Sequence, residues 1–183
     1  MKIAFLDRDG VINRDVHYLS KIHDFEYVDR SKEALRLLRA NAYEIVIVTN
    51  QAGIGRGLVT PEEYRDLTNF YLDDLRRCGV SILDVYHCPH HPEASIEGYR
   101  KVCVNRKPQP GMIKDAMLKY EVNPEQSFLV GDKVSDVEAG LAAGINSVFL
   151  VETGHTLEET VYNKYVVLKD LYQVTEVVLR RND

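Results

Sequence analysis

The chain has 183 residues, of which 45% are hydrophobic and 28% charged, so its length and composition fit one domain spanning residues 1–183. Its formal net charge of -5 argues against a general nucleic-acid-binding protein, because such proteins need a basic face to displace counterions from phosphates. The N-terminal apolar stretch is too short for a signal peptide, and no later stretch approaches a membrane span. We therefore expect a cytoplasmic protein that is not bound to a membrane.

Apolar runs alternate with helical patterns along the chain. In chain order, the strands expected from apolar content are residues 3–6, 43–48, 82–86, 127–130, 147–151 and 165–168. The expected helices are residues 31–40, 60–77, 111–120 and 135–143, the second opening on a capping box at Thr60 and the fourth on one at Ser135. We expect the stretch from about 154 onward to add little beyond an edge strand and a closing helix. This alternation predicts an α/β fold with a mainly parallel sheet covered by helices on both faces.

The first apolar run stops abruptly at two carboxylates, Asp7 and Asp9. Residues two apart in extended backbone point to the same side, so both acids can face one reacting atom, and Gly10 lets the chain turn away. Two like charges this close repel each other unless a cation or a protein base neutralises them. The segment therefore predicts a divalent metal ion, a split in pKa between the two acids, or both.

Two further polar residues are expected at the same edge of the sheet. Thr49 and Asp132 each follow an expected strand, as Asp7 does. In open parallel sheets ligands collect at the carboxyl ends of the strands, so the three side chains should converge on one site.

Four motifs along residues 7–136 match a known family in order and spacing. They are Asp7-Arg8-Asp9-Gly10, Thr49-Asn50, Lys107-Pro108 and Gly131-Asp132-Lys133-Val134-Ser135-Asp136. With these motifs the chain resembles the haloacid-dehalogenase-type phosphatases, which implies a three-layer Rossmann-like fold. Within that superfamily residues 49–57, 88–92 and 103–108 resemble the D-glycero-D-manno-heptose-1,7-bisphosphate 7-phosphatases, and histidinol-phosphate phosphatases share much of the pattern.

The resemblance implies Mg²⁺-dependent hydrolysis through an aspartyl-phosphate formed on Asp7. Asp9 would protonate the leaving alkoxide and later take a proton from water, so Asp7 should stay ionised while Asp9 cycles its proton. The implied Mg²⁺ ligands are the Asp7 carboxylate, the Asp9 main-chain carbonyl and the Asp132 carboxylate. Thr49 and Lys107 would contact the phosphoryl oxygens, and Arg106 is suited to a second phosphate contact. The remaining expected substrate-binding residues are Asp15, His17, Tyr18, Asn50, Gln51 and Lys133.

Plainer explanations exist for several of these residues. A Thr at a strand end is usually a turn residue, and a Lys in a Pro-flanked loop is usually a solvated charge. Asp136 could simply face the dipole of its helix, although the family uses this acid to steady the lysine and the metal site. The order of the four motifs favours the functional interpretation.

A second constellation is Cys88-x-His90 followed by Cys103-x-Asn105. The family pattern at these positions is Cys-x-His and Cys-x-Cys, a tetrahedral structural zinc site, so Asn105 replaces the fourth ligand. An amide oxygen is a poor substitute for a thiolate, and His87 or His91 could substitute locally. Two interpretations stay open: Zn²⁺ held by Cys88, His90 and Cys103, or free thiols in a loop without metal.

The gaps between the motifs leave no room for a large cap domain, since helices and strands fill most of them. Loops at about 13–24, 51–60 and 88–106 must then select the substrate. We expect a monomer that hydrolyses a small phosphorylated sugar, and the resemblance implies that this is heptose 1,7-bisphosphate, cleaved at the 7-phosphate. The alternatives are a histidinol-phosphate phosphatase and a catalytically silent sugar-phosphate-binding protein on the same fold.

Overall fold

One parallel sheet runs through the centre of the computed structural model, which describes residues 1–180. Within these residues it has six strands in the order β3-β2-β1-β4-β5-β6, and every neighbouring pair is parallel. The strands are β1 (Ile3–Leu6), β2 (Glu44–Asn50), β3 (Asp84–Cys88), β4 (Phe128–Gly131), β5 (Ser147–Val151) and β6 (Val167–Leu168). The chain builds outward from β1 to β3 and then returns to add β4 on the other side of β1. This reversal between β1 and β4 is where open α/β sheets form their ligand crevice.

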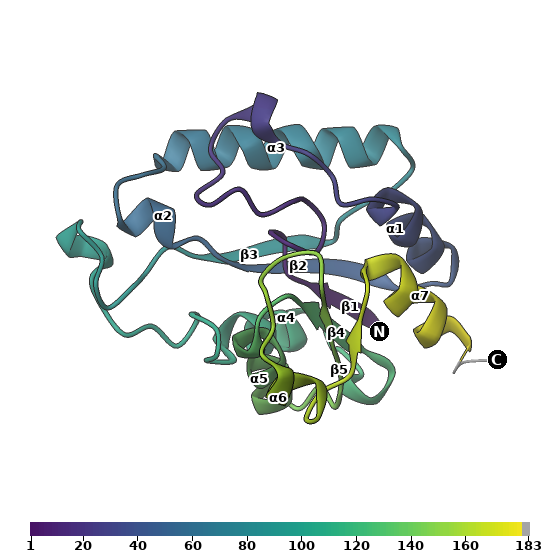
Figure 1. Ribbon diagram of the computed structural model, residues 1–183. Coiled ribbons are helices and arrows are strands. Elements are labelled where there is room, and N and C mark those ends of the chain that lie inside the picture. The colour runs from purple at the N-terminus through teal and green to yellow at the C-terminus, as the bar shows by residue number, and fades with distance from the viewer. Residues whose placement is uncertain (181–183) are drawn as a thin grey trace.

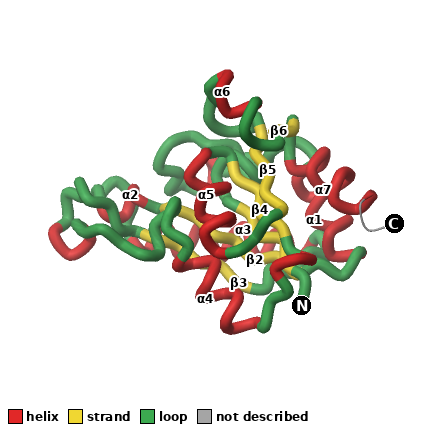
Figure 2. Tube along the Cα trace, turned by 90° about the horizontal axis from the view of Figure 1, so that it is seen from below, coloured by secondary structure: helices red, strands yellow, loops and turns green. Residues whose placement is uncertain are grey.

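Helices cover both faces of the sheet, as the alternation predicts (Figure 1). The helices are α1 (Ser31–Ala40), α2 (Ala52–Gly55), α3 (Pro61–Arg77), α4 (Gly111–Tyr120), α5 (Val134–Ala143), α6 (Glu159–Tyr162) and α7 (Leu171–Arg180). One-turn 3-10 helices lie at η1 (Ile22–Asp24), η2 (Glu97–Tyr99) and η3 (Pro124–Gln126). Figure 2 shows the strands between α4 and α5 on one side and α1 and α7 on the other. The fold is therefore a three-layer Rossmann-like arrangement.

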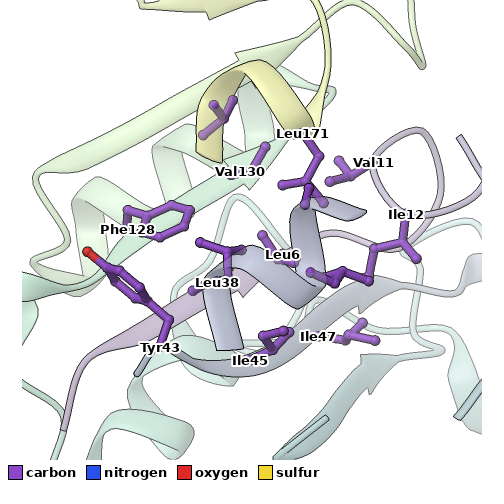
Figure 3. Packing of buried hydrophobic residues seen from close by; sticks show 14 of the residues in the cluster. Leu6, Val11, Ile12, Leu38, Tyr43, Ile45, Ile47, Phe128, Val130 and Leu171 are labelled. Atoms are coloured by element: carbon purple, nitrogen blue, oxygen red, sulfur yellow. The ribbon is translucent and has the colours of Figure 1, made fainter. Parts of the chain in front are cut away.

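Strand alternation divides the core between the two faces. In β1, Ala4 and Leu6 pack with α1, α3 and α7, whereas Ile3 and Phe5 pack with α4 and α5. Figure 3 shows the first of these clusters, with Leu6 near Leu38 of α1. Because all four β1 side chains are fully buried, the strand is held rigidly on both faces. Because β1 is rigid, the backbone of the next residue, Asp7, has a fixed position.

The expected helices 31–40 and 111–120 are confirmed, and the capping box at Thr60 is present. Its Oγ1 accepts from the Glu63 amide at 3.1 Å, while Glu63 Oε2 accepts from the Thr60 amide at 2.8 Å. The capping box expected at Ser135 is wrong, because α5 begins one residue earlier, at Val134. Asp136 serves instead: its Oδ2 accepts from the Lys133 amide at 2.9 Å.

The bounds of β2, β3, β4 and β6 also differ from expectation. Strand β2 continues through Asn50, so Thr49 lies inside the strand rather than after it, and β3 lies two residues later than residues 82–86. The expected strand 165–168 is reduced to the two residues of β6 at the sheet edge. Among the described residues, no helix is long and apolar enough to cross a membrane.

Candidate active site

A cavity of about 470 Å³ opens at the carboxyl ends of β1, β2 and β4. Its wall contains most of the residues expected from sequence, namely Asp7, Asp9, Asp15, His17, Tyr18, Thr49, Asn50, Gln51, Arg106, Lys107 and Lys133. Asp132 is fully buried next to this wall, where it bonds to the lining residue His155. The structure therefore brings residues from the four motifs to one place.

Asp7 lies against the ammonium group of Lys107. The distance from Lys107 Nζ to Asp7 Oδ2 is 3.0 Å, and the same nitrogen donates to the Val48 carbonyl at 2.7 Å. Lys107 is also 2.6 Å from Asp136 Oδ1, so one cation sits between two carboxylates. Burial by itself would lower the pKa of Lys107, but Asp136 and Asp7 outweigh it and raise that pKa. Lys107 is therefore a fixed positive charge beside Asp7.

Asp9 has a different environment. Its carboxylate accepts hydrogen bonds from the Arg8 guanidinium, at 2.8 Å for Nη2 to either oxygen, and from Asn13 Nδ2 and Gln51 Nε2, both at 2.9 Å. Arg8 is fully buried. Burial would raise the pKa of Asp9, but the charge of Arg8 and these hydrogen bonds hold it below its usual value.

A split in acidity between the two acids is present without a cation: the pKa of Asp7 lies above its usual value and that of Asp9 below it. Burial raises the pKa of Asp7 to about 6 despite Lys107, and the nearby charges of Asp136 and Asp9 add to the rise. Without a cation, Asp7 therefore takes up a proton at a higher pH than Asp9 does. The sequence predicts the roles of the two acids with Mg²⁺ bound, and it does not show that the guanidinium of Arg8 folds back onto Asp9.

The donor set beside Asp7 suits a hard divalent cation. Carboxylate oxygens of Asp7, Asp132 and Asp136 lie within 4.8 Å of one another, and all three residues are buried. Asp132 Oδ1 is buried without a hydrogen-bond partner in the described structure, and burial together with the charge of Asp7 raises the pKa of this carboxyl. An orphaned carboxylate oxygen in an all-oxygen cluster fits Mg²⁺, whose preferred ligands are of this kind.

Side chains from β2 support the centre. Thr49 Oγ1 is buried and accepts from Gln51 Nε2 at 2.9 Å. Asn50 donates to the Lys107 carbonyl at 3.0 Å and accepts from the Lys107 amide at 3.1 Å. Both ends of the Asn50 amide are thus engaged in clamping the Lys107 backbone, so Asn50 contributes to this cavity chiefly by placing that lysine.

The outer part of the cavity carries two guanidinium groups. Arg56 donates to the Tyr18 hydroxyl at 3.0 Å and lies 3.5 Å from His91 Nε2, while Arg106 donates to the His90 carbonyl at 3.2 Å. Both arginines are partly buried, and burial lowers the pKa of Arg106. Arg56 and His91 were not among the expected site residues, although both lie inside strings that carry the family resemblance.

His155 is the other residue that sequence reasoning missed, and the expectation that the chain from 154 onward adds only an edge strand and a helix is wrong. His155 follows β5 and lines the cavity. Its Nδ1 lies 2.6 Å from Asp132 Oδ2 and 3.5 Å from Asp15 Oδ2. A lone histidine in a polar loop gives no periodic or motif signal, so only the tertiary structure reveals it.

The Cys/His constellation is gathered outside this cavity. Ligand atoms of Cys88, His90 and Cys103 lie within 4.8 Å of one another. Neither expected substitute joins them: the His87 ring packs on Tyr64, with 4.4 Å between centroids, and His91 faces Arg56. Burial raises the pKa of the Cys88 thiol to about 11. The two thiols and one imidazole are suitable as three of the four ligands of a tetrahedral zinc site. Asn105 stands where the family has the fourth ligand, and it has no thiol.

Comparison with known proteins places these features in a family. A family model described as HAD-hydrolase-like matches residues 104–174. The chain is 47% identical to the D-glycero-alpha-D-manno-heptose-1,7-bisphosphate 7-phosphatase of Photorhabdus laumondii, over 97% of each chain. It is 41% identical to the D-glycero-beta-D-manno-heptose-1,7-bisphosphate 7-phosphatase of Escherichia coli K12, over 82% of this chain and 78% of that protein. A solved D,D-heptose 1,7-bisphosphate phosphatase from B. bronchiseptica, complexed with magnesium and phosphate, is similar at a TM-score of 0.83 and 29% identity, over 99% of each chain.

Proposed function

Because the chain belongs to the HAD-like hydrolase family and is a phosphatase, we propose that it removes the 7-phosphate of D-glycero-D-manno-heptose 1,7-bisphosphate in the cytoplasm. The substrate assignment rests on the residues that line one cavity. The same cavity contains the buried Asp7–Lys107 pair and the guanidinium groups of Arg56 and Arg106. A sugar with a phosphate at each end would present one phosphate to the pair and the other to the guanidinium groups.

In the proposed reaction Asp7 attacks phosphorus in line with the departing sugar oxygen. The bond from phosphorus to that oxygen breaks as the bond to Asp7 forms. Asp9, which must first take up a proton because its pKa is lowered in the metal-free protein, gives that proton to the leaving alkoxide. A water molecule then attacks the aspartyl-phosphate, Asp9 takes its proton, and inorganic phosphate leaves with Asp7 restored. Lys107 and Thr49 contact the equatorial oxygens, where negative charge concentrates.

The proposed cation is Mg²⁺, held by the Asp7 carboxylate, the Asp9 main-chain carbonyl and the unpartnered Asp132 oxygen. When bound it supplies positive charge to the phosphoryl group. Lys107 Nζ lies 3.0 Å from Oδ2 of Asp7 and the Arg8 amide donates to Oδ1 at 2.7 Å, so both oxygens of the proposed nucleophile are held in a fixed orientation.

Substrate selection is assigned to the loops, since residues 1–180 form no cap domain over the cavity. Asp15, His17 and Tyr18 come from the first loop and offer polar groups to the sugar hydroxyls. His17 and Tyr18 both have positive φ, at 52° and 54°, so the loop holds an unusual backbone conformation at the cavity wall. Lys133, at the start of α5, and Gln51 complete the polar wall.

We propose a zinc ion at Cys88, His90 and Cys103 as a separate structural feature. Three protein ligands leave one position open, so this site should bind Zn²⁺ more weakly than a four-ligand site. Its role is to steady residues 88–106, since Arg106 donates to the His90 carbonyl.

The protein is proposed to act as a monomer with residues 1–183 in one domain.

The test is phosphate release from a matched panel: both anomers of heptose 1,7-bisphosphate, heptose 7-phosphate and histidinol phosphate, each with Mg²⁺. We expect the highest kcat/KM for a bisphosphate, and no release above background from the Asp7→Asn variant. A preference of about tenfold or more for histidinol phosphate, equivalent to about 1.4 kcal/mol of transition-state binding, would overturn the heptose assignment. Comparison of the two anomers then fixes the configuration at C1, because relatives named for each are similarly identical to this chain.

A further inference from the structure

The two oxygens of the Asp132 carboxylate have unequal surroundings. Oδ2 accepts from the backbone amide of His155 at 3.1 Å and lies 2.6 Å from its imidazole Nδ1. Oδ1 is buried and has no partner among the described residues. One oxygen is thus held by His155 at two points, and this fixes the direction in which the other oxygen points.

The loop that carries His155 is built to approach this carboxylate closely. Thr153 donates from its hydroxyl to the Gly10 carbonyl at 2.6 Å, which ties the loop after β5 to the turn after β1. At Gly154 an added Cβ would lie 2.1 Å from Asp132 Oδ2, so only glycine allows the backbone to come so near. The backbone on the N-terminal side of His155 is therefore held in place, and this positions His155 against Asp132.

The proton on the imidazole can be placed from its neighbours. Nδ1 faces Oδ2 of Asp132 at 2.6 Å and Oδ2 of Asp15 at 3.5 Å. Both neighbours of Nδ1 are carboxylate oxygens, so we place the ring proton on Nδ1, where it can be donated to Asp132 Oδ2.

We propose that His155 is a positioning residue for the metal site: by holding Oδ2 of Asp132, it aims Oδ1 at the divalent cation. The inference rests on the proposed function, which makes Asp132 a metal ligand. It assigns no contact between His155 and the reacting atoms. Partners that orient a ligating carboxylate commonly contribute about 10- to 100-fold in metal affinity.

A rival explanation is that His155 is itself a ligand, because Asp15, Asp132 and His155 also form a group able to hold a metal ion. A ligating Nδ1 would have to give up its proton and would then face two acceptor oxygens without a hydrogen between them. That role would also leave the orphaned Oδ1 of Asp132 unexplained. The positioning role predicts that His155→Asn keeps its metal affinity, because its side-chain N–H can replace the Nδ1–H donor. The amide oxygen of Asn can itself bind a hard cation, so the ligand role is tested on wild type, in which a ligating imidazole nitrogen would couple to the bound Mn²⁺ in the resonance spectrum.

The experiment measures Mn²⁺ binding to chelator-treated protein by electron paramagnetic resonance at pH 7.5, with Mg²⁺ binding by calorimetry as a second readout. The His155 side chain is 37% exposed, so its variants should fold, and melting temperature checks this. We expect His155→Ala to bind Mn²⁺ about 10- to 100-fold more weakly and His155→Asn to stay within about threefold of wild type. The control His23→Ala removes a histidine whose side chain is 80% exposed and which does not line the cavity.

Activity with the heptose bisphosphate separates positioning from other roles. In His155→Ala the Mg²⁺ concentration for half-maximal rate should rise, while kcat at saturating Mg²⁺ stays within about threefold of wild type. Unchanged Mn²⁺ affinity in His155→Ala, or equal losses in the Ala and Asn variants, would overturn the positioning role alone. If wild type binds neither cation, the metal assignment of the proposed function fails, and the role of His155 fails with it.

Discussion

Lys107 Nζ lies 2.6 Å from Asp136 Oδ1, and both side chains are almost completely buried. Asp136 also caps α5 through the Lys133 amide, so it connects the start of a helix to the ammonium group beside Asp7. Together these contacts make Lys107 a positive charge whose position is set by two elements from different parts of the sequence. The first prediction follows from this relationship.

Replacement of Lys107 by Met should destabilise the protein as well as inactivate it. The change leaves Asp7 and Asp136 buried without their shared counter-charge, and breaking a buried ion pair in this way costs about 3–5 kcal/mol. Urea unfolding in the presence of chelator measures the loss. Lys119→Met removes a largely exposed ion pair with Asp84 and should cost about 1 kcal/mol or less. Equal losses in the two variants would contradict a structural role for the buried triad.

Without divalent cations, the free energy of unfolding should decrease as the pH rises, because Asp7 loses its proton. Its pKa is raised from 3.8 to about 6, so the folded state binds this proton more tightly than the unfolded state does. The contribution is fully present below about pH 4 and is lost as the pH rises through about 6. Melting temperatures of chelated wild type and Asp7→Asn from pH 4 to 7 should show a larger fall in wild type, because the variant keeps only the raised pKa of Asp132.

Added Mg²⁺ should stabilise wild type more at pH 7 than at pH 5, because at the lower pH the cation must displace a proton from Asp7. The gain in melting temperature at fixed Mg²⁺ is the measurement. A gain that does not change across this pH range would show that the cation does not bind at Asp7.

Replacement of Asp9 by Asn should lower kcat by about 100- to 10,000-fold with an alkyl phosphate, the usual size of a general acid–base effect. The loss in the rate of Asp7 phosphorylation should be smaller with p-nitrophenyl phosphate, whose leaving group needs little protonation. Rapid-quench measurement of that first step makes the comparison. Losses of equal size with both leaving groups would remove Asp9 from the role of acid.

Arg56→Gln should raise KM for the bisphosphate by about tenfold and leave KM for heptose 7-phosphate nearly unchanged. Arg56 would contact the phosphate that does not react, so its contribution is the same in the ground state and the transition state. Steady-state kinetics on both substrates measure this. Arg14→Gln is the matched control, since Arg14 is exposed, pairs with Glu26 and does not line the cavity. An equal rise in KM for both substrates would show that Arg56 contacts the sugar or the reacting phosphate and not the distal phosphate.

Zinc content should depend on Cys88 and not on Cys78. Protein purified without chelator is expected to hold zinc that Cys88→Ser loses and Cys78→Ser keeps, because Cys78 ends α3 and is not part of the Cys88, His90 and Cys103 group. Mass spectrometry of metals per chain is the measurement. Zinc near zero in wild type would show that three ligands are too few and would leave the phosphatase assignment unaffected.

Several features followed from the sequence by itself, because they depend on local patterns. Apolar runs indicate where the strands lie to within about two residues, except at the short β6, and the Thr60 capping box marks the start of α3. The position of Asp7 also follows, since it is the first residue after a strand that is buried on both faces.

Only the tertiary structure decided the chemical state of these groups. Arg8 and Asp9 are neighbours in sequence, yet their bidentate pairing depends on how Arg8 is buried, and this sets the direction of the split in acidity. His155 reaches Asp132 across 23 positions in the sequence. Such contacts arise because the crossover connections of the sheet bring loops that are distant in sequence to one sheet edge. The electrostatic energy of each buried charge then depends on all the groups around it. Local sequence patterns can therefore place the carboxylates, but they cannot reveal which groups hold them.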